Sequence, residues 1–220
     1  MFDTTHLLQK ILHGNKRKDF IDMNQTLHSQ TFSSTKNSSL RFSTKELVMG
    51  GLFAALMGGI SQLSIPMPTG VPITVQVFGI ALIGVTLGSK LGCLSTIIYL
   101  LLGAVGLPVF ANFGGGLSRF VSMTGGYLWS YPIMAVLCGI RPSTGNKKKD
   151  TVLILICSIT GLLLVETIGG LQWSALSGGA MPLSAVFAYS MAAFIPKDIL
   201  LTVLAVFTGL SMRKVLDHIR

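Results

Sequence analysis

Six apolar segments, separated by short polar or glycine-rich connections, dominate the chain from residue 46 onward. They span residues 46–65, 73–87, 91–106, 126–140, 151–173 and 183–212. A helix needs about 20 apolar residues to cross a bilayer perpendicularly, so the shorter segments must recruit loop residues or thin the bilayer locally. The pattern predicts an all-α integral membrane protein, a bundle of six transmembrane helices.

Composition supports this fold class. Half of the 220 residues are hydrophobic and only 11% are charged, against about a quarter in an average soluble domain. Residues 1–45 differ, because they are rich in Ser and Thr and hold seven basic and three acidic residues. We expect a disordered cytoplasmic extension there, or alternatively an organelle-targeting segment. The expected domains are this extension, a membrane domain at 46–212 and a short basic tail at 213–220.

The positive charges predict the orientation. Fifteen of the seventeen Lys and Arg residues lie in the N-terminal segment, at Lys90, in residues 141–149 and in residues 213–220. These are alternate connections, so the positive-inside rule places both termini in the cytoplasm. The net charge of +9 then indicates topology and contact with an anionic lipid bilayer, not nucleic-acid binding. We expect a multi-pass cell-membrane protein, or an organelle-membrane protein if the extension is a targeting signal.

Two basic residues depart from this rule, Arg119 in the glycine-rich connection 106–127 and Lys197 in the last apolar segment. The connection is expected to fold as a lid with glycine turns. Pro196, which precedes Lys197, is expected to kink the last helix. An ionisable residue near mid-membrane costs roughly 2.5–3.5 kcal/mol, which favours a functional site over a local ion pair. Because adjacent helix positions point about 100° apart, Lys197 and Asp198 are not expected to face each other.

Two further polar residues lie within apolar segments. Glu166 could pair with Lys197, contact a ligand or lie near the membrane interface. Gln76 could offer a donor and an acceptor to a bound molecule, or make a helix–helix hydrogen bond. A pocket with cationic, anionic and amide groups suits a small amphipathic ligand that carries a carboxylate.

Small residues form two rows on the first segment. Gly50, Ala54 and Gly58 make one row, and Gly51, Ala55 and Gly59 make the other. Such rows allow close helix approach, so they indicate either internal packing or a docking surface for another membrane subunit.

Several function classes are disfavoured. The three cysteines lie in apolar runs without CxxC spacing, and the four histidines lie in the tails, so no metal site or cofactor is expected. The chain has no Walker A motif, so energy for any transport must come from a partner or a gradient.

The stretch "GVPITVQVFGIALIGVTLGSKLGCLSTIIYLLLGAVGLPVFANFGGG", followed by "TGGYLWSY", resembles the BioY family of biotin-binding S components of energy-coupling factor (ECF) transporters. The resemblance covers about residues 46–212. It implies a six-helix membrane protein, not an enzyme, that captures biotin from outside. It further implies a scaffold membrane protein and two ATPase subunits as partners, with the Gly50, Ala54 and Gly58 row as the docking surface.

The resemblance also implies roles for individual residues. Asn112, after "PVFA", would contact the ureido ring of biotin, and Asp198 would accept its N–H groups. Arg119 or Lys197 would hold the valerate carboxylate through a charge-assisted bond. Family members often carry a lysine one helical turn after the aspartate, where this chain has Leu201, which favours Arg119. The expected wall residues are Gln76 and Tyr127.

Two alternatives remain. The chain could be an S component for a different vitamin. More remotely, Glu166 and Asp198 could act as the acid–base pair of an intramembrane enzyme, although no nucleophile or metal constellation accompanies them.

Overall fold

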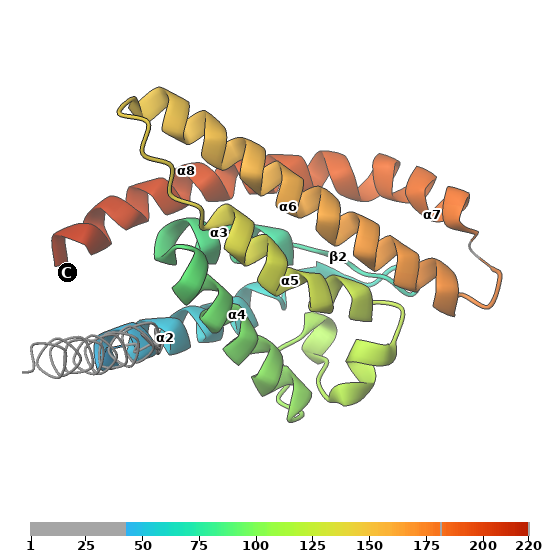
Figure 1. Ribbon diagram of the computed structural model, residues 1–220. Coiled ribbons are helices and arrows are strands. Elements are labelled where there is room, and N and C mark those ends of the chain that lie inside the picture. Colours follow the sequence, from blue (N-terminus) through green and yellow to red (C-terminus); the bar gives the residue numbers. More distant parts are fainter. Residues whose placement is uncertain (1–42, 181, 220) are drawn as a thin grey trace, which may run out of the picture. The chain divides into compact units, whose positions relative to one another are not determined.

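The computed structural model of the chain describes residues 43–180 and 182–219. The predicted extension at 1–45 lies outside the described residues except for its last three positions. The described part is mostly helical, and each of the six predicted apolar segments contains a helix (Figure 1). Its elements are α2 (Thr44–Ile60), β1 (Ser64–Ile65), β2 (Ile73–Thr74), α3 (Gln76–Leu87), α4 (Ser89–Ala104), the 3₁₀ turns η1 (Ala111–Phe113) and η2 (Leu117–Val121), α5 (Gly125–Cys138), α6 (Lys147–Leu176), α7 (Leu183–Tyr189), the π-helical turn η3 (Ser190–Phe194) and α8 (Ile195–Ile219).

Local signals explain where several helices begin and end. Helix α2 begins at Thr44 because Ser43 and Glu46 form a capping box, in which each side chain accepts a hydrogen bond from the other residue's backbone N–H. Gly88 alone joins α3 to α4, and its φ of 86° provides the left-handed turn. Helix α8 continues to Ile219, so the expected basic tail is helical through most of its length.

Helix α3 lies at the centre of the bundle. It packs against α4, α5 and α8, while α6 packs against α5 and α8. Every residue of α3 except Phe78 is buried. Glycines make these contacts close, because a Cβ at Gly84 would lie 2.6 Å from the Ala135 carbonyl oxygen, and one at Gly92 would lie 3.1 Å from Gly84 Cα. The first residue of this central helix is Gln76, so its amide enters the bundle interior.

The last apolar segment changes helix type before Pro196. A π-helical turn, Ser190–Phe194, precedes Pro196 and joins α7 to α8. A proline ring clashes with the carbonyl four residues back, and wider π turns relieve such conflicts in helices. The structure thus shows a local widening of the helix before Pro196, and the predicted kink stays a prediction.

Of the two rows of small residues on α2, one is interior and one is exposed. A Cβ at Gly50 would contact Leu91 and Ile98, and one at Gly58 would contact Val109. Ala54 is 1% exposed. The Gly50, Ala54 and Gly58 row thus serves internal packing against α4 and the following loop, and as a buried row it has no free surface for a docking partner. The row of Gly51, Ala55 and Gly59 faces outward, and the two glycines have open space around them.

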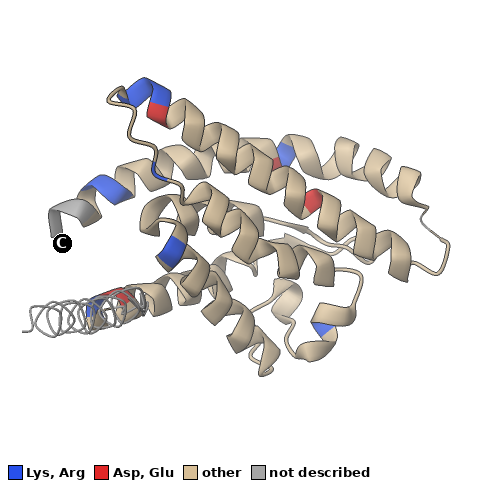
Figure 2. Cartoon of the chain, in the orientation of Figure 1, with Lys and Arg blue, Asp and Glu red and all other residues tan. Residues whose placement is uncertain are grey.

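Charge and apolar surface are segregated in the described residues. Basic side chains gather at one end of the bundle, where α2 and α6 begin, α3 turns into α4 and α8 ends (Figure 2). The sides of the helices carry many exposed apolar residues, among them Leu52, Leu101, Trp129, Ile156, Leu163, Leu200, Leu204 and Phe207. Two helical stretches, residues 147–176 and 183–216, are long and apolar enough to cross a membrane.

Candidate ligand-binding site

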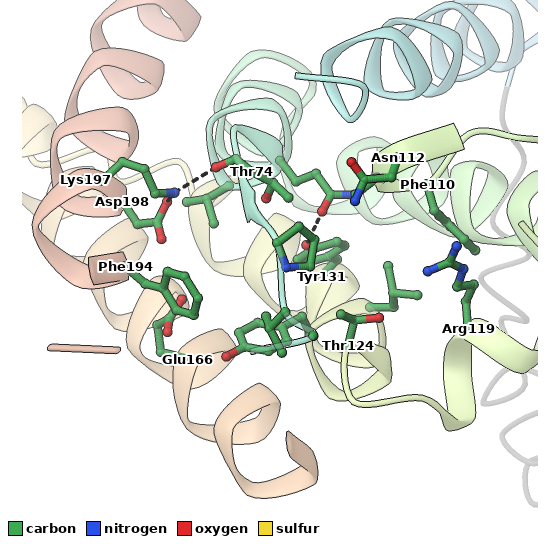
Figure 3. Close-up of a pocket in the computed structure, with 18 residues that line it drawn as sticks. Thr74, Phe110, Asn112, Arg119, Thr124, Tyr131, Glu166, Phe194, Lys197 and Asp198 are labelled. Atoms are coloured by element: carbon green, nitrogen blue, oxygen red, sulfur yellow. Dashed lines mark hydrogen bonds and ion pairs between the residues drawn. The ribbon is translucent and has the colours of Figure 1, made fainter. Parts of the chain in front are cut away.

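A pocket lies in the part of the bundle away from the end where most basic residues gather. It lies between the β1–β2 hairpin, the connection from α4 to α5, and helices α3, α5, α6 and α8 (Figure 3). The cavity volume is about 100 Å³, smaller than the roughly 300–1,000 Å³ of typical small-molecule sites. All six expected ligand contacts line it: Gln76, Asn112, Arg119, Tyr127, Lys197 and Asp198.

Gln76 is held at the pocket wall by two tyrosines. Its Nε2 donates to the Tyr99 hydroxyl over 2.9 Å, and its Oε1 accepts from the Tyr131 hydroxyl over 3.0 Å. The interpretation of Gln76 as a helix–helix hydrogen-bonding residue is therefore confirmed, because it joins α3, α4 and α5. It also lines the pocket, and its contact with a ligand stays a prediction. An amide has two N–H donors and two acceptor lone pairs, so half of its hydrogen-bonding capacity remains for a ligand.

Lys197 and Asp198 form an ion pair, contrary to the expectation that neighbours in a helix would not face each other. The lysine side chain is long and flexible enough for its Nζ to reach the carboxylate of the adjacent Asp198. Its Nζ also donates to the Thr74 carbonyl oxygen over 2.7 Å, which ties α8 to strand β2. The Asp198 side chain is 4% exposed, so the pair largely neutralises a charge buried at the pocket wall.

Glu166 does not pair with Lys197, because the ammonium group is taken by Asp198 and Thr74. Glu166 is 5% exposed and lines the pocket. Its Oε2 has no hydrogen-bond partner among the described residues. The predicted pairing of Glu166 with Lys197 is therefore wrong, and its contact with a ligand stays a prediction.

The connection from α4 to α5 folds as a lid, as its glycines and aromatic residues predict. A chain of ring contacts, Tyr99–Phe110–Phe120–Trp129, runs through it with centroid separations of 5.0–5.7 Å. Phe110 and Phe120 are 3% and 7% exposed, whereas Phe113 points outward and is 74% exposed. The lid therefore has its own small apolar core, which seats it on α4 and α5.

The lid is clamped to the end of α2 by Gln62, which follows that helix. The Oε1 of Gln62 accepts from the Phe113 N–H over 2.9 Å. Its Nε2 lies within hydrogen-bond distance of the Pro108 and Phe110 carbonyl oxygens, at 3.2 Å each. One side chain thus fixes the lid backbone on both sides of Asn112.

Asn112 and Phe113 adopt left-handed backbone conformations, with φ of 56° and 54°. The sequence indicated glycines for such turns, yet here two non-glycine residues adopt them. Asparagine tolerates this region better than most residues, and Ser64 supports it by accepting from the Asn112 N–H over 3.1 Å. The strained turn places the Asn112 side chain at the pocket.

Arg119 lies on the lid, where Gly114 makes room for it. A Cβ at Gly114 would lie 2.8 Å from the guanidinium carbon of Arg119. Among the described residues no acidic side chain forms an ion pair with Arg119. The pocket therefore holds one neutralised pair, one free cation on the lid and one free carboxyl group on α6.

Some pocket residues were not predicted from the sequence. Tyr131, Thr74, Thr124 and Phe194 also line the pocket. Tyr131 lies four residues after Tyr127, one turn along the same helix, and that spacing could have identified it. Within the described part of the chain, no group of three His, Cys, Asp or Glu residues could hold a metal ion.

The helical bundle, its apolar sides and its polar pocket are typical of a membrane protein that binds a small molecule. The model of the BioY family matches residues 31–218, a longer match than the motifs alone indicated. The chain is 34% identical over 175 residues to the biotin transporter BioY of Rhizobium etli, covering 76% of this chain and 92% of that one. It is 32% identical over 182 residues to the biotin transporter BioY of Rhodobacter capsulatus, covering 79% and 94%.

A solved structure agrees with these similarities. The fold matches the crystal structure of the S-component for biotin from an ECF-type ABC transporter, with a TM-score of 0.67 and 28% identity. The match covers 79% of this chain and 95% of the other. The chain belongs to the BioY family, a family of transport proteins and not of enzymes.

Proposed function

We propose that this chain captures biotin from outside the cell as the substrate-binding S component of an ECF-type transporter. The observation that carries the proposal is the convergence of Gln76, Asn112, Arg119, Tyr127, Lys197 and Asp198 on one pocket under the lid. Biotin has a carboxylate at one end and a ureido ring with two N–H donors and a carbonyl at the other. The pocket offers matching groups for both ends.

The carboxylate of the ligand would bind Arg119. Lys197 already donates to Asp198 and to the Thr74 carbonyl oxygen, whereas no acid in the described residues pairs with Arg119. A guanidinium group also matches the planar, bidentate geometry of a carboxylate. Asn112, which also lies on the lid and lines the pocket, would contact the ureido ring.

The orientation proposed is a multi-pass protein of the cell membrane, with its basic end in the cytoplasm and its pocket outside. Lys45, Lys90, residues 147–149 and residues 213–214 belong to the basic end (Figure 2), which supports this orientation under the positive-inside rule. The exposed apolar sides of the helices would contact lipid.

The partners proposed are an ECF scaffold membrane protein and two ATPase subunits. The exposed row of Gly51, Ala55 and Gly59 on α2 is better suited to the scaffold than the buried row of Gly50, Ala54 and Gly58. Small residues on an open helix face allow another helix to approach closely.

Equilibrium binding of labelled biotin to the detergent-purified chain tests the function. We expect saturable binding that Arg119→Ala weakens by roughly 10- to 100-fold, the loss of one charge-assisted bond. Asp198→Asn should also weaken binding, and Lys90→Ala, at the opposite end, should leave it unchanged. Biotin methyl ester should bind wild type and Arg119→Ala almost equally. If the folded, monodisperse protein does not bind biotin, the ligand is wrong and other vitamins must be tried.

A further inference from the structure

One wall of the pocket holds polar atoms without partners. Glu166 Oε2, Tyr127 Oη and Ser190 Oγ are buried, and none has a hydrogen-bond partner among the described residues. The three side chains come from α6, α5 and the π-helical turn, and the residues are 5%, 8% and 1% exposed. The Ser190 hydroxyl interacts with both other groups, but neither contact has the geometry of a well-formed hydrogen bond. They therefore form one cluster, which we call the Glu166 cluster.

Such a cluster is unusual in a bundle built for stability alone. Buried polar groups are nearly always hydrogen-bonded, because burial without a partner is costly. Here Glu166 Oε2 and two hydroxyls lie side by side without a well-formed hydrogen bond, and Glu166 and Tyr127 also line the pocket. The Tyr127 ring is pressed against Gly169, one turn beyond Glu166, so the cluster cannot simply collapse on itself. Its geometry suits groups supplied by a ligand.

The charges of the pocket indicate which ligand groups these are. Asp198 is engaged by Lys197, so Glu166 is the acid that lacks a partner. Figure 3 shows Glu166 and Arg119 on opposite sides of the pocket. A ligand with a carboxylate at one end and N–H donors at the other would satisfy both residues at once. The bond between Arg119 and a ligand carboxylate is charge-assisted, and Glu166 offers an acceptor to N–H donors, so this pairing would favour one orientation of the ligand.

We propose that Glu166 accepts a hydrogen bond from a ureido N–H of the ligand, with the Tyr127 and Ser190 hydroxyls completing the subsite. Glu166 thereby determines specificity for a ring that carries N–H donors. The inference rests on the proposed function and adds a second acid to the one that the sequence assigned to the ureido ring, Asp198.

The test measures biotin affinity and thermal stability of Glu166→Gln, which keeps the size of the side chain. We expect Glu166→Gln to bind biotin roughly 10- to 100-fold more weakly than wild type. Without ligand it should unfold at the same or a higher temperature, because an unpaired buried carboxyl group has been removed. The matched control is Thr167→Ala on the same helix, whose exposed hydroxyl bonds only to the Leu163 carbonyl oxygen. Its affinity should equal that of wild type.

The second part of the test measures the affinity of both proteins for biotin analogues methylated at either ureido nitrogen. Wild type should discriminate against at least one of them by 10-fold or more, and Glu166→Gln should lose most of that discrimination. Wild-type affinity in Glu166→Gln, or unchanged discrimination between biotin and both analogues, would overturn the inference and leave the proposed function standing. That result would assign the cluster to buried water. Absence of biotin binding by wild type would overturn both.

Discussion

The contact between the lid and α4 depends on Gly103, which lies against the ring of Phe110. The variant Gly103→Ala adds one methyl group at this contact and tests whether the lid packs there. A Cβ at Gly103 would overlap the ring of Phe110, which is 3% exposed and lines the pocket. Phe110 cannot move freely, because Tyr99 and Phe120 hold it edge to face from two sides. Gly103→Ala must therefore shift the centre of the lid's apolar core.

The size of the effect follows from two opposing terms. Overpacking a tight core costs about 1–3 kcal/mol, and alanine recovers at most about 1 kcal/mol of helix propensity near the end of α4. A net loss of about 1–2 kcal/mol of stability is expected. Since the lid must close on the ligand, the same energy should weaken biotin binding by roughly 5- to 30-fold.

The matched control is Gly51→Ala, the same chemical change in the interior of α2, where a Cβ has open space. It should stabilise the protein by about 0.5–1 kcal/mol through helix propensity alone and leave biotin affinity unchanged. Thermal unfolding and equilibrium biotin binding of both variants in the same detergent give the comparison. If Gly103→Ala is as stable as wild type and binds biotin as well, the lid is not seated on α4 in this way.

Three other changes probe separate parts of the molecule. Gln62→Ala removes the clamp on the lid and should speed biotin dissociation about 10-fold or more, the loss of one to two hydrogen bonds; an unchanged rate would contradict the clamp. Gln76→Leu leaves the buried Tyr99 and Tyr131 hydroxyls unpaired and should cost about 2–4 kcal/mol of stability; restoration by adding Tyr99→Phe and Tyr131→Phe would identify the cause. Ala55→Leu should abolish co-purification with the scaffold partner while biotin affinity stays at the wild-type value.

The sequence predicts the helices well because apolar periodicity and sparse charge are strong, local signals. It also predicts the lid, since glycines beside aromatic residues favour a compact loop. The two-residue strands β1 and β2 were not predicted, because pairs such as Ser64–Ile65 and Ile73–Thr74 have no periodicity of their own. Their pairing depends on the chain returning between α2 and α3.

Side-chain pairing was harder to predict than position. The sequence identifies Lys197 and Asp198 as unusual, but helix geometry alone argues against their ion pair, which depends on the length of lysine and on the Thr74 carbonyl oxygen. The left-handed turn at Asn112 likewise depends on Ser64 and Gln62, some fifty residues earlier in the chain. Such contacts are set by tertiary packing, which a single sequence does not show.

The chain of ring contacts Tyr99–Phe110–Phe120–Trp129 ends at a tryptophan, whose fluorescence can be measured. Of the two tryptophans in the chain, Trp173 is fully buried, whereas Trp129 is 60% exposed and donates from Nε1 to the Phe120 carbonyl oxygen over 3.3 Å. Lifting of the lid would remove both the aromatic neighbour and the hydrogen bond of Trp129. The emission of Trp129 would then report lid movement without any attached dye.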